Sequence, residues 1–156
     1  MIGRKRVKRS RNGRYSLKLP DEERELLRRL PGQLRELLGT DDPSLRRLFP
    51  PAYLDDPEKD ADYQRLMRDE LLVRHEAALT IMEETVDATD LDEPQLTAWM
   101  TALNELRLVL GTRLDVSEDD DFSAHLDPED ELAPAYALYG YLGWLQEEIV
   151  TALAGW

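Results

Sequence analysis

Residues 132–153 of this 156-residue chain have the sequence LAPAYALYGYLGWLQEEIVTAL. The stretch predicts a helix with apolar side chains on every side until Gln146. Gly140 and Gly143 permit a close approach of a neighbouring backbone. A helix without a polar face must lie at the centre of a bundle or in a subunit interface. The uncharged run Leu132–Gln146 has only 15 residues, which is too short to span a bilayer.

Three longer helices are expected before this one. The first starts after Pro20 with three acids and ends at Gly39, and Pro31 should kink it or break it into two pieces. The second covers about 57–87, after a short helix at Pro43–Leu48. The third covers about 93–110 and is weakened or closed by Gly111. The predicted buried stripe of the 57–87 helix is Tyr63, Met67, Leu71, Ala78, Met82 and Thr85, widened by Leu66 and Ile81.

A β-hairpin is expected at the N-terminal end. Asn12-Gly13 favours a two-residue turn of type I′, which needs positive φ at both central positions. After the turn, Tyr15, Leu17 and Leu19 alternate with polar residues, so one edge should be buried while cations point outward. The predicted fold is therefore an all-α helical bundle with a short N-terminal basic β-hairpin. It forms a single domain, 1–156, with the hairpin at 1–19, the bundle at 20–156 and an acidic loop at 116–130.

Charge divides the chain into two unlike parts. Residues 1–75 carry 18 Lys/Arg and 14 Asp/Glu, whereas residues 76–156 carry 2 and 19. The first 18 residues hold eight cations and no acid. Surfaces of opposite sign indicate contacts with partners more than chemistry on a small molecule.

The cations of the hairpin are the main candidates for partner binding. Three interpretations stay open: they lie on acidic surface of the chain or of a second copy, they bind a protein partner, or they bind nucleic acid through its phosphates. Tyr15 is the only aromatic residue nearby for stacking on bases. The candidate residues are Arg4, Lys5, Arg6, Lys8, Arg9, Arg11 and Arg14.

Arg107 and Arg113 are the only Lys or Arg residues after His75. We expect them to pair with carboxylates, for example Glu105, Asp115 or neighbours on other helices, and to stabilise helix packing. A role in binding a partner is the alternative interpretation.

No pattern in the chain predicts catalysis, a metal or a cofactor. The chain has no cysteine, so it has no thiol nucleophile, disulfide or thiolate metal site. The Asp119–Asp121 run does not match a calcium loop, and His75 and His125 form no ligand set. The chain also has no serine nucleophile elbow and no phosphate-binding glycine motif. An enzyme with a pocket near His75 is therefore the least supported hypothesis.

Four stretches of the sequence resemble one known family from end to end and in the same order. The stretch Leu103–Val116 (LNELRLVLGTRLDV) resembles the signature of the actinobacterial oxidative-stress regulator AosR family, long catalogued as a domain of unknown function. Three further stretches agree: Gly13-Arg14-Tyr15 leading to Leu19-Pro20, Asp42–Tyr53, and Tyr139–Gln146.

This resemblance implies a cytoplasmic regulator that is not an enzyme. The family's role is to support transcription under oxidative stress through an alternative sigma factor, with sensing attributed to a pair of cysteines. This chain has no cysteine, so that switch is not carried over. We further expect a homodimer, because the apolar last helix and the hairpin edge both favour association.

Overall fold

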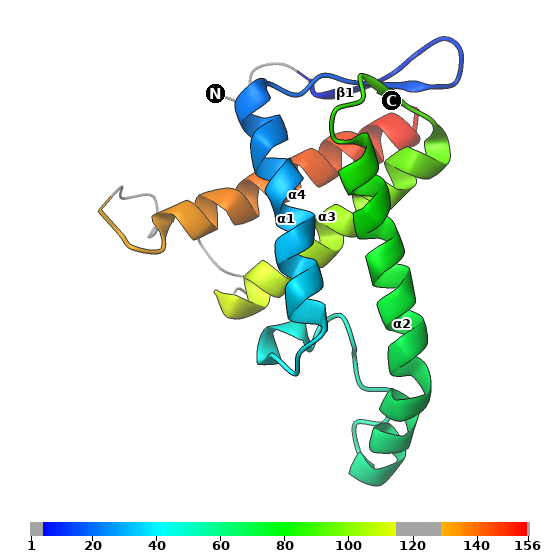
Figure 1. Cartoon of the computed structure of the whole chain (residues 1–156), viewed down its shortest axis with the longest axis vertical. Coiled ribbons are helices and arrows are strands. Elements are labelled where there is room, and N and C mark those ends of the chain that lie inside the picture. The colour runs from blue at the N-terminus through cyan, green and yellow to red at the C-terminus, as the bar shows by residue number, and fades with distance from the viewer. Residues whose placement is uncertain (1–4, 115–128, 156) are drawn as a thin grey trace.

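The computed structural model describes residues 5–114 and 129–155, and it confirms a mainly helical fold with a small sheet (Figure 1). The hairpin lies across one end of the helices, close to the C-terminal end of the last helix. In chain order the elements are β1 (Val7–Arg9), β2 (Tyr15–Leu17), α1 (Asp21–Leu38), the 3-10 helix η1 (Pro43–Leu45), α2 (Pro57–Thr85), β3 (Asp90–Leu91), α3 (Glu93–Arg113) and α4 (Ala133–Leu153).

The sheet is antiparallel, with β2 between β1 and β3. The alternation predicted for the second strand is confirmed, because Tyr15, Leu17 and Leu19 are all buried. Val7 lies opposite Leu17 and is buried as well. The third strand was not predicted, since Asp90–Leu91 is too short to show a pattern of its own.

The predicted turn of the hairpin is one residue too short. Arg9 pairs with Tyr15, and the Ser10 N–H donates to the Arg14 carbonyl (2.7 Å), so three residues form the loop. Gly13 closes this loop at φ +78°, as expected for a three-residue hairpin loop. The pairing keeps Val7 opposite Leu17 on the buried face, and burial of one face is a strong determinant of register.

Helix α1 is a single helix, so the predicted break at Pro31 is wrong. Proline in a helix interior costs about 3 kcal/mol because one hydrogen bond is lost. Here Pro31 itself is buried, and four leucines of the same helix are buried with it. Each buried leucine contributes roughly 1.5–3 kcal/mol, which offsets the lost bond. The four are Leu27, Leu30, Leu34 and Leu38.

Helix α2 is buried only near its C-terminal end. It begins where the Asp56 carboxylate accepts a hydrogen bond from the Lys59 N–H (3.1 Å), and its 29 residues extend for about 43 Å. Its buried residues all lie within the last two turns, from Ala78 onward. Leu66 is 79% exposed, so its predicted place in the buried stripe is wrong. The N-terminal half of α2 projects beyond the other helices, where little of the chain can cover it (Figure 1).

Helix α3 starts as predicted and ends later. Asp92 and Gln95 form a reciprocal capping box, with distances of 2.8 and 2.9 Å. The helix continues through Gly111 to Arg113, so the predicted end at Gly111 is wrong. A Cβ at Gly111 would lie 2.9 Å from a ring carbon of Tyr139. The glycine therefore permits the close crossing of α3 and α4.

Trp99 of α3 is fully buried and links α3 to α2. Its indole N–H donates to the Thr85 hydroxyl (2.7 Å), and that hydroxyl donates to the Ile81 carbonyl (2.6 Å). The polar atoms of this buried contact therefore have partners, as a stable core requires.

Helix α4 is not central within one copy of the chain, so that expectation is wrong. Only one stripe of the helix is buried, formed by Leu142, Leu145, Ile149 and Ala152. Leu132 just before it is 47% exposed, and Val150 is 42% exposed. The alternative, a subunit interface, stays a prediction. No helix in the described part of the chain is long and apolar enough to cross a membrane.

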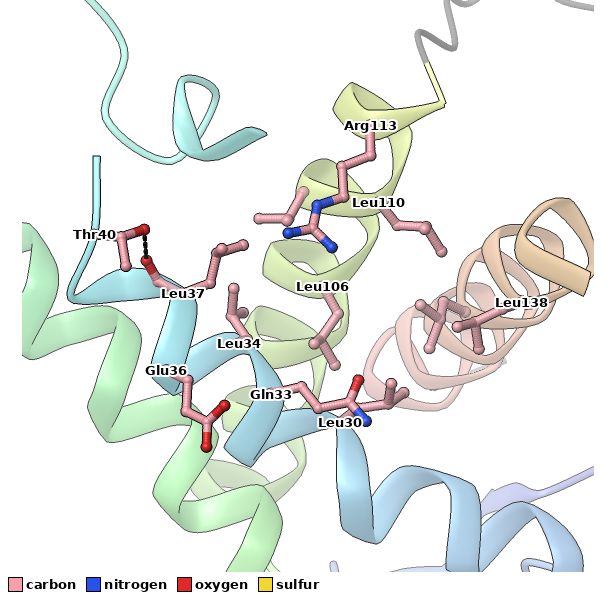
Figure 2. Close-up of a pocket in the computed structure, with 12 residues that line it drawn as sticks. Leu30, Gln33, Leu34, Glu36, Leu37, Thr40, Leu106, Leu110, Arg113 and Leu138 are labelled. Atoms are coloured by element: carbon pink, nitrogen blue, oxygen red, sulfur yellow. Dashed lines mark hydrogen bonds between the residues drawn. The ribbon is translucent and has the colours of Figure 1, made fainter. Parts of the chain in front are cut away.

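A cavity of about 390 Å³ opens between α1, α3 and α4 (Figure 2). Leucines of all three helices and Val109 form its walls. The polar residues around it are Gln33, Glu36, Thr40 and Arg113.

Candidate partner-binding surface

Arg6 lies inside the molecule and not on the outer face of the hairpin. Its side chain is 8% exposed, and its Nε and Nη2 donate to the two carboxylate oxygens of Glu23 at 3.0 and 2.7 Å. Its backbone N–H donates to Glu148 Oε1 (2.7 Å), and its guanidinium stands 5.3 Å from the ring centre of Trp144. Arg6 therefore joins the hairpin to α1 and α4.

This pairing controls the ionisation of Glu23. The hydrogen bond from Arg6 holds the pKa of Glu23 below its usual value, and the Tyr141 hydroxyl also donates to Glu23 (2.8 Å). Burial, together with the Glu23 carboxylate, raises the pKa of Tyr141. The Glu23 carboxylate stays charged at neutral pH, so the Arg6 guanidinium already has an ion-pair partner within the chain. The prediction that Arg6 points outward to a partner is wrong.

Arg14 also forms an ion pair within the chain. Its Nε donates to Asp90 Oδ2 (2.5 Å), which links β2 to β3, and this bond raises the pKa of Arg14. Both side chains remain about half exposed, 43% and 53%. Arg4, the first of the predicted cations, lies outside the described residues.

Four of the predicted cations remain at the surface of the hairpin. Lys5, Lys8, Arg9 and Arg11 are exposed. None of them forms an ion pair with a carboxylate of residues 5–114 or 129–155. All four line a groove of about 470 Å³ between the hairpin and the last turns of α4. We call this the basic groove; its lining is completed by Val7, Ser10, Glu148, Thr151, Ala152 and Gly155.

The charge of the basic groove suits an anionic partner. Glu148 is the acid that lines the groove. Its carboxylate already accepts a hydrogen bond from the Arg6 backbone N–H, which holds it next to the hairpin. Tyr15 is 3% exposed, so its ring is not available for stacking on a base. The groove can bind carboxylates or phosphates through charge, but it offers no aromatic ring of the hairpin for reading bases.

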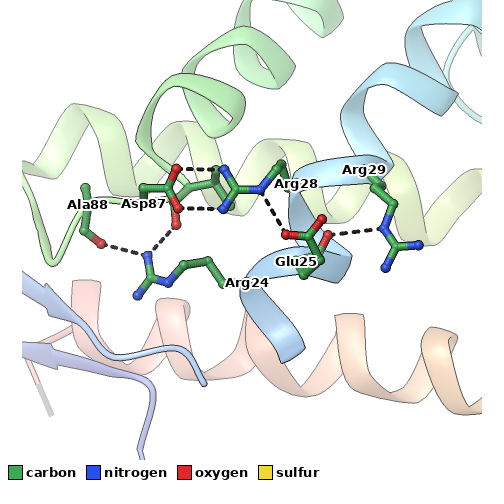
Figure 3. Close-up of polar contacts among 7 residues, drawn as sticks. Arg24, Glu25, Arg28, Arg29, Asp87 and Ala88 are labelled. Atoms are coloured by element: carbon green, nitrogen blue, oxygen red, sulfur yellow. Dashed lines mark hydrogen bonds and ion pairs between the residues drawn. The ribbon is translucent and has the colours of Figure 1, made fainter. Parts of the chain in front are cut away.

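The cations of α1 contrast with those of the hairpin (Figure 3). Arg28 donates to both oxygens of Asp87 (2.7 and 2.6 Å), and Arg24 donates to the Ala88 carbonyl (3.1 Å). Arg35 pairs with Glu83 of α2. These arginines connect α1 to the end of α2 and to the segment that follows it.

Arg107 and Arg113 both lie on α3, and the predicted pairing with a carboxylate is found for Arg113 but not for Arg107 among the described residues. The Arg107 guanidinium stands 6.0 Å from the ring centre of Tyr139, and its buried Nε has no hydrogen-bond partner among the described residues. Glu105, its expected partner, is bound by His75 instead, and Asp115 lies outside the described residues. Arg113 comes within 3.8 Å of Asp42. The structure does not bring these two arginines to the basic groove.

His75 has a hydrogen-bond partner at each ring nitrogen. Its Nδ1 lies 2.7 Å from Glu105 Oε1, and its Nε2 lies 3.0 Å from the Leu48 carbonyl. Burial alone would lower the pKa of His75, but the hydrogen bonds to Glu105 and Leu48 outweigh it and raise that pKa. Burial raises the pKa of Glu105. His75 and Glu105 therefore connect α2, α3 and the segment after η1.

Within residues 5–114 and 129–155, no three His, Asp or Glu side chains are grouped so that they could hold a metal ion. His125 and the acidic loop predicted at 116–130 lie almost wholly outside the described residues.

Comparison with known proteins decides the family. Residues 4–153 match the family described as Domain of unknown function (DUF2017). The chain belongs to the DUF2017 family. This agrees with the resemblance in the sequence, because curated relatives of the chain include the Oxidative stress regulator AosR of Mycobacterium bovis and of two strains of Mycobacterium tuberculosis.

Each of these relatives is 30% identical over 131 residues, which is 73% of this chain and 59% of the relative. This DUF2017 chain therefore spans about three-fifths of the length of the curated relatives it matches. No solved structure matches it.

The C-terminal end of α4 forms the wall of the basic groove opposite the hairpin, and the sequence analysis did not predict it. Thr151, Ala152 and Gly155 come from the end of α4, far from the hairpin in the sequence. The one available signal was Glu147-Glu148, a charged pair after a long apolar run, which indicates a polar contact at that point of the helix.

Proposed function

We propose that this DUF2017 protein is a non-enzymatic regulator that acts by binding a protein of the transcription machinery through its basic groove. The partner is a sigma factor or a polymerase subunit with an acidic surface. The observation that carries the proposal is the set of four exposed cations around one groove, none of which forms an ion pair with a carboxylate of the described residues.

The name of the curated relatives supports a regulatory role for this chain. That name belongs to proteins longer than the matched region, so the role comes to this chain as part of the proposal. Because the sequence contains no cysteine, regulation here would proceed without a thiol switch in this chain, through its amount or through the partner.

A charge-reversal variant tests the basic groove directly. The tagged chain is used to capture proteins from the native cell extract at low salt, with and without oxidant, and the captured proteins are identified by mass spectrometry. The test variant is Arg9→Glu/Arg11→Glu. The matched control is Arg65→Glu/Arg74→Glu, which changes the net charge by the same amount at two exposed positions of α2.

The proposal requires that the wild type and the control capture a sigma factor or polymerase subunit and that the groove variant loses it. Capture that survives reversal of the groove would contradict it, and so would failure of the wild type to capture any such protein.

Nucleic acid is the second candidate for the same cations, favoured by their density on the hairpin. A gel-shift experiment distinguishes the two. Binding to duplex DNA would weaken steeply with salt and disappear in Arg9→Glu/Arg11→Glu, which keeps the buried Arg6 and Val7 in place. Because Tyr15 is buried, contact would be confined to the phosphate backbone, with little preference for sequence.

A further inference from the structure

The cavity between α1, α3 and α4, called the slot below, has mainly apolar walls and is open to solvent on one side. Its five innermost side chains are between 1% and 8% exposed, although they line a space of about 390 Å³. A helix is about 10–12 Å wide and needs an open, exposed groove. A single hydrocarbon chain can enter a slot whose walls are so little exposed. The five side chains are Leu30, Leu34, Leu106, Val109 and Leu142.

The volume of the cavity limits the length of the chain that it can hold. A water molecule occupies about 30 Å³, and a methylene group is of similar size. A space of 390 Å³ then holds about a dozen such groups. This corresponds to an unbranched chain of roughly eight to twelve carbons. Pockets of this size, with apolar walls and few polar groups, are typical of small-molecule sites.

One cation stands at the mouth of the slot. Figure 2 shows the Arg113 guanidinium extending from α3 over the cavity, whereas the Glu36 carboxylate points away from it. The Arg113 side chain is 54% exposed, and its nearest described carboxylate, Asp42, is 3.8 Å away, which is too long for a hydrogen bond. The Thr40 hydroxyl is engaged with the Leu37 carbonyl (2.7 Å). Arg113 can therefore bind a carboxylate through two parallel N–H bonds.

We propose that this slot binds an aliphatic monocarboxylate of about eight to twelve carbons, with its alkyl chain between α1, α3 and α4 and its carboxylate on Arg113. The site shares no residue with the basic groove, so it does not depend on the proposed function.

Calorimetric titration of the whole chain with sodium decanoate, below its micelle concentration, tests the proposal. We expect saturable binding with one site per chain. Decyltrimethylammonium has the same alkyl chain with the opposite charge, and butyrate has the same charge with a short chain. Each should bind at least about tenfold more weakly, because each lacks one of the two recognised features.

Two variants locate the binding site. Leu138→Trp, at a partly exposed position of the lining, should fill the slot and abolish decanoate binding. Arg113→Gln should weaken it about tenfold, since a hydrogen bond to a charged group is lost. Arg65→Gln, on the exposed half of α2, is the matched control and should bind like the wild type. Should Leu138→Trp fail to fold, as judged by circular dichroism, Arg113→Gln decides alone because that side chain is half exposed.

The proposal is overturned if the wild type shows no saturable binding, if decyltrimethylammonium binds as tightly as decanoate, or if Arg113→Gln binds like the wild type. Arg9→Glu/Arg11→Glu should bind decanoate like the wild type, whatever partner the basic groove has. A failure of this proposal can therefore be distinguished from a failure of the proposed function.

Discussion

Arginines of the hairpin fall into two groups, one buried and one exposed. Arg6 is 8% exposed and is held by Glu23 and Trp144. At the basic groove, Arg9 and Arg11 are exposed and form no ion pair with a carboxylate in the described part of the chain. A desolvated charge needs its partner, whereas an exposed charge contributes little to folding and stays available for binding.

The comparison shows that cation density alone does not identify a binding surface. Seven cations of the hairpin were equal candidates in the sequence. In the structure, four of them surround the basic groove, two are engaged within the molecule and Arg4 is not described. The experiments below test this division, from the largest expected effect to the smallest.

Removing the buried cation Arg6 should have the largest effect on stability. Arg6→Ala leaves Glu23 without its main partner and removes the packing on Trp144, so we expect the free energy of unfolding to fall by about 2 to 3 kcal/mol. Urea denaturation measures this loss. Lys8→Ala, two residues away at the basic groove, is the control and should leave the urea midpoint unchanged. Equal effects of the two substitutions would remove the distinction between the buried and the exposed cations.

Reversing the charge of the exposed cations at the basic groove should change binding and not stability. Arg9→Glu/Arg11→Glu should weaken binding of an acidic partner by about tenfold or more, and this difference should shrink as salt rises. Titration of the purified partner at low and at high salt measures both quantities. A shift of the urea midpoint in this variant would instead indicate that these cations stabilise the fold.

His75 extends the comparison to a second buried cation. The raised pKa of His75 means that the folded state holds the proton better than the unfolded state does. Its contribution to stability is complete below the ordinary histidine pKa of about 6.5 and is lost as pH rises through the raised value. The raised pKa of Glu105 acts in the same direction. We therefore expect the wild type to be less stable at pH 8 than at pH 6.

Urea denaturation of His75→Gln should show a smaller difference between pH 6 and pH 8 than the wild type does. The chain has one other histidine, so His125→Gln is the matched control and should keep the full difference. If both variants keep it, the pair of His75 and Glu105 is not its source.

The exposed pair of Arg28 and Asp87 should have the smallest effect. Its two hydrogen bonds are short, but both side chains face solvent, 42% and 66% exposed. Arg28→Gln should leave the urea midpoint within experimental error. A clear loss of stability would show that the hydrogen bonds between α1 and the end of α2 act as one network and not as separate surface contacts.

Local features of the sequence predicted most of the secondary structure. Asp56 and Asp92 cap helices through bonds to residues three positions later, so the starts of α2 and α3 could be recognised without knowledge of the rest of the chain. The alternation from Tyr15 to Leu19 located the second strand in the same way. The break predicted as one outcome at Pro31 did not occur, because the burial that keeps α1 continuous comes from other parts of the chain.

By itself, the sequence determined the helical class, the basic hairpin and the family, because caps, periodicity and charge are properties of neighbouring residues. Only the tertiary structure decided that Arg6 faces inward, that half of α2 projects into solvent, and that α1, α3 and α4 leave a slot between them. Each of these depends on groups far apart in the chain: Arg6 meets Glu148 across 142 positions. No local pattern encodes such a meeting, because it results from how whole elements pack.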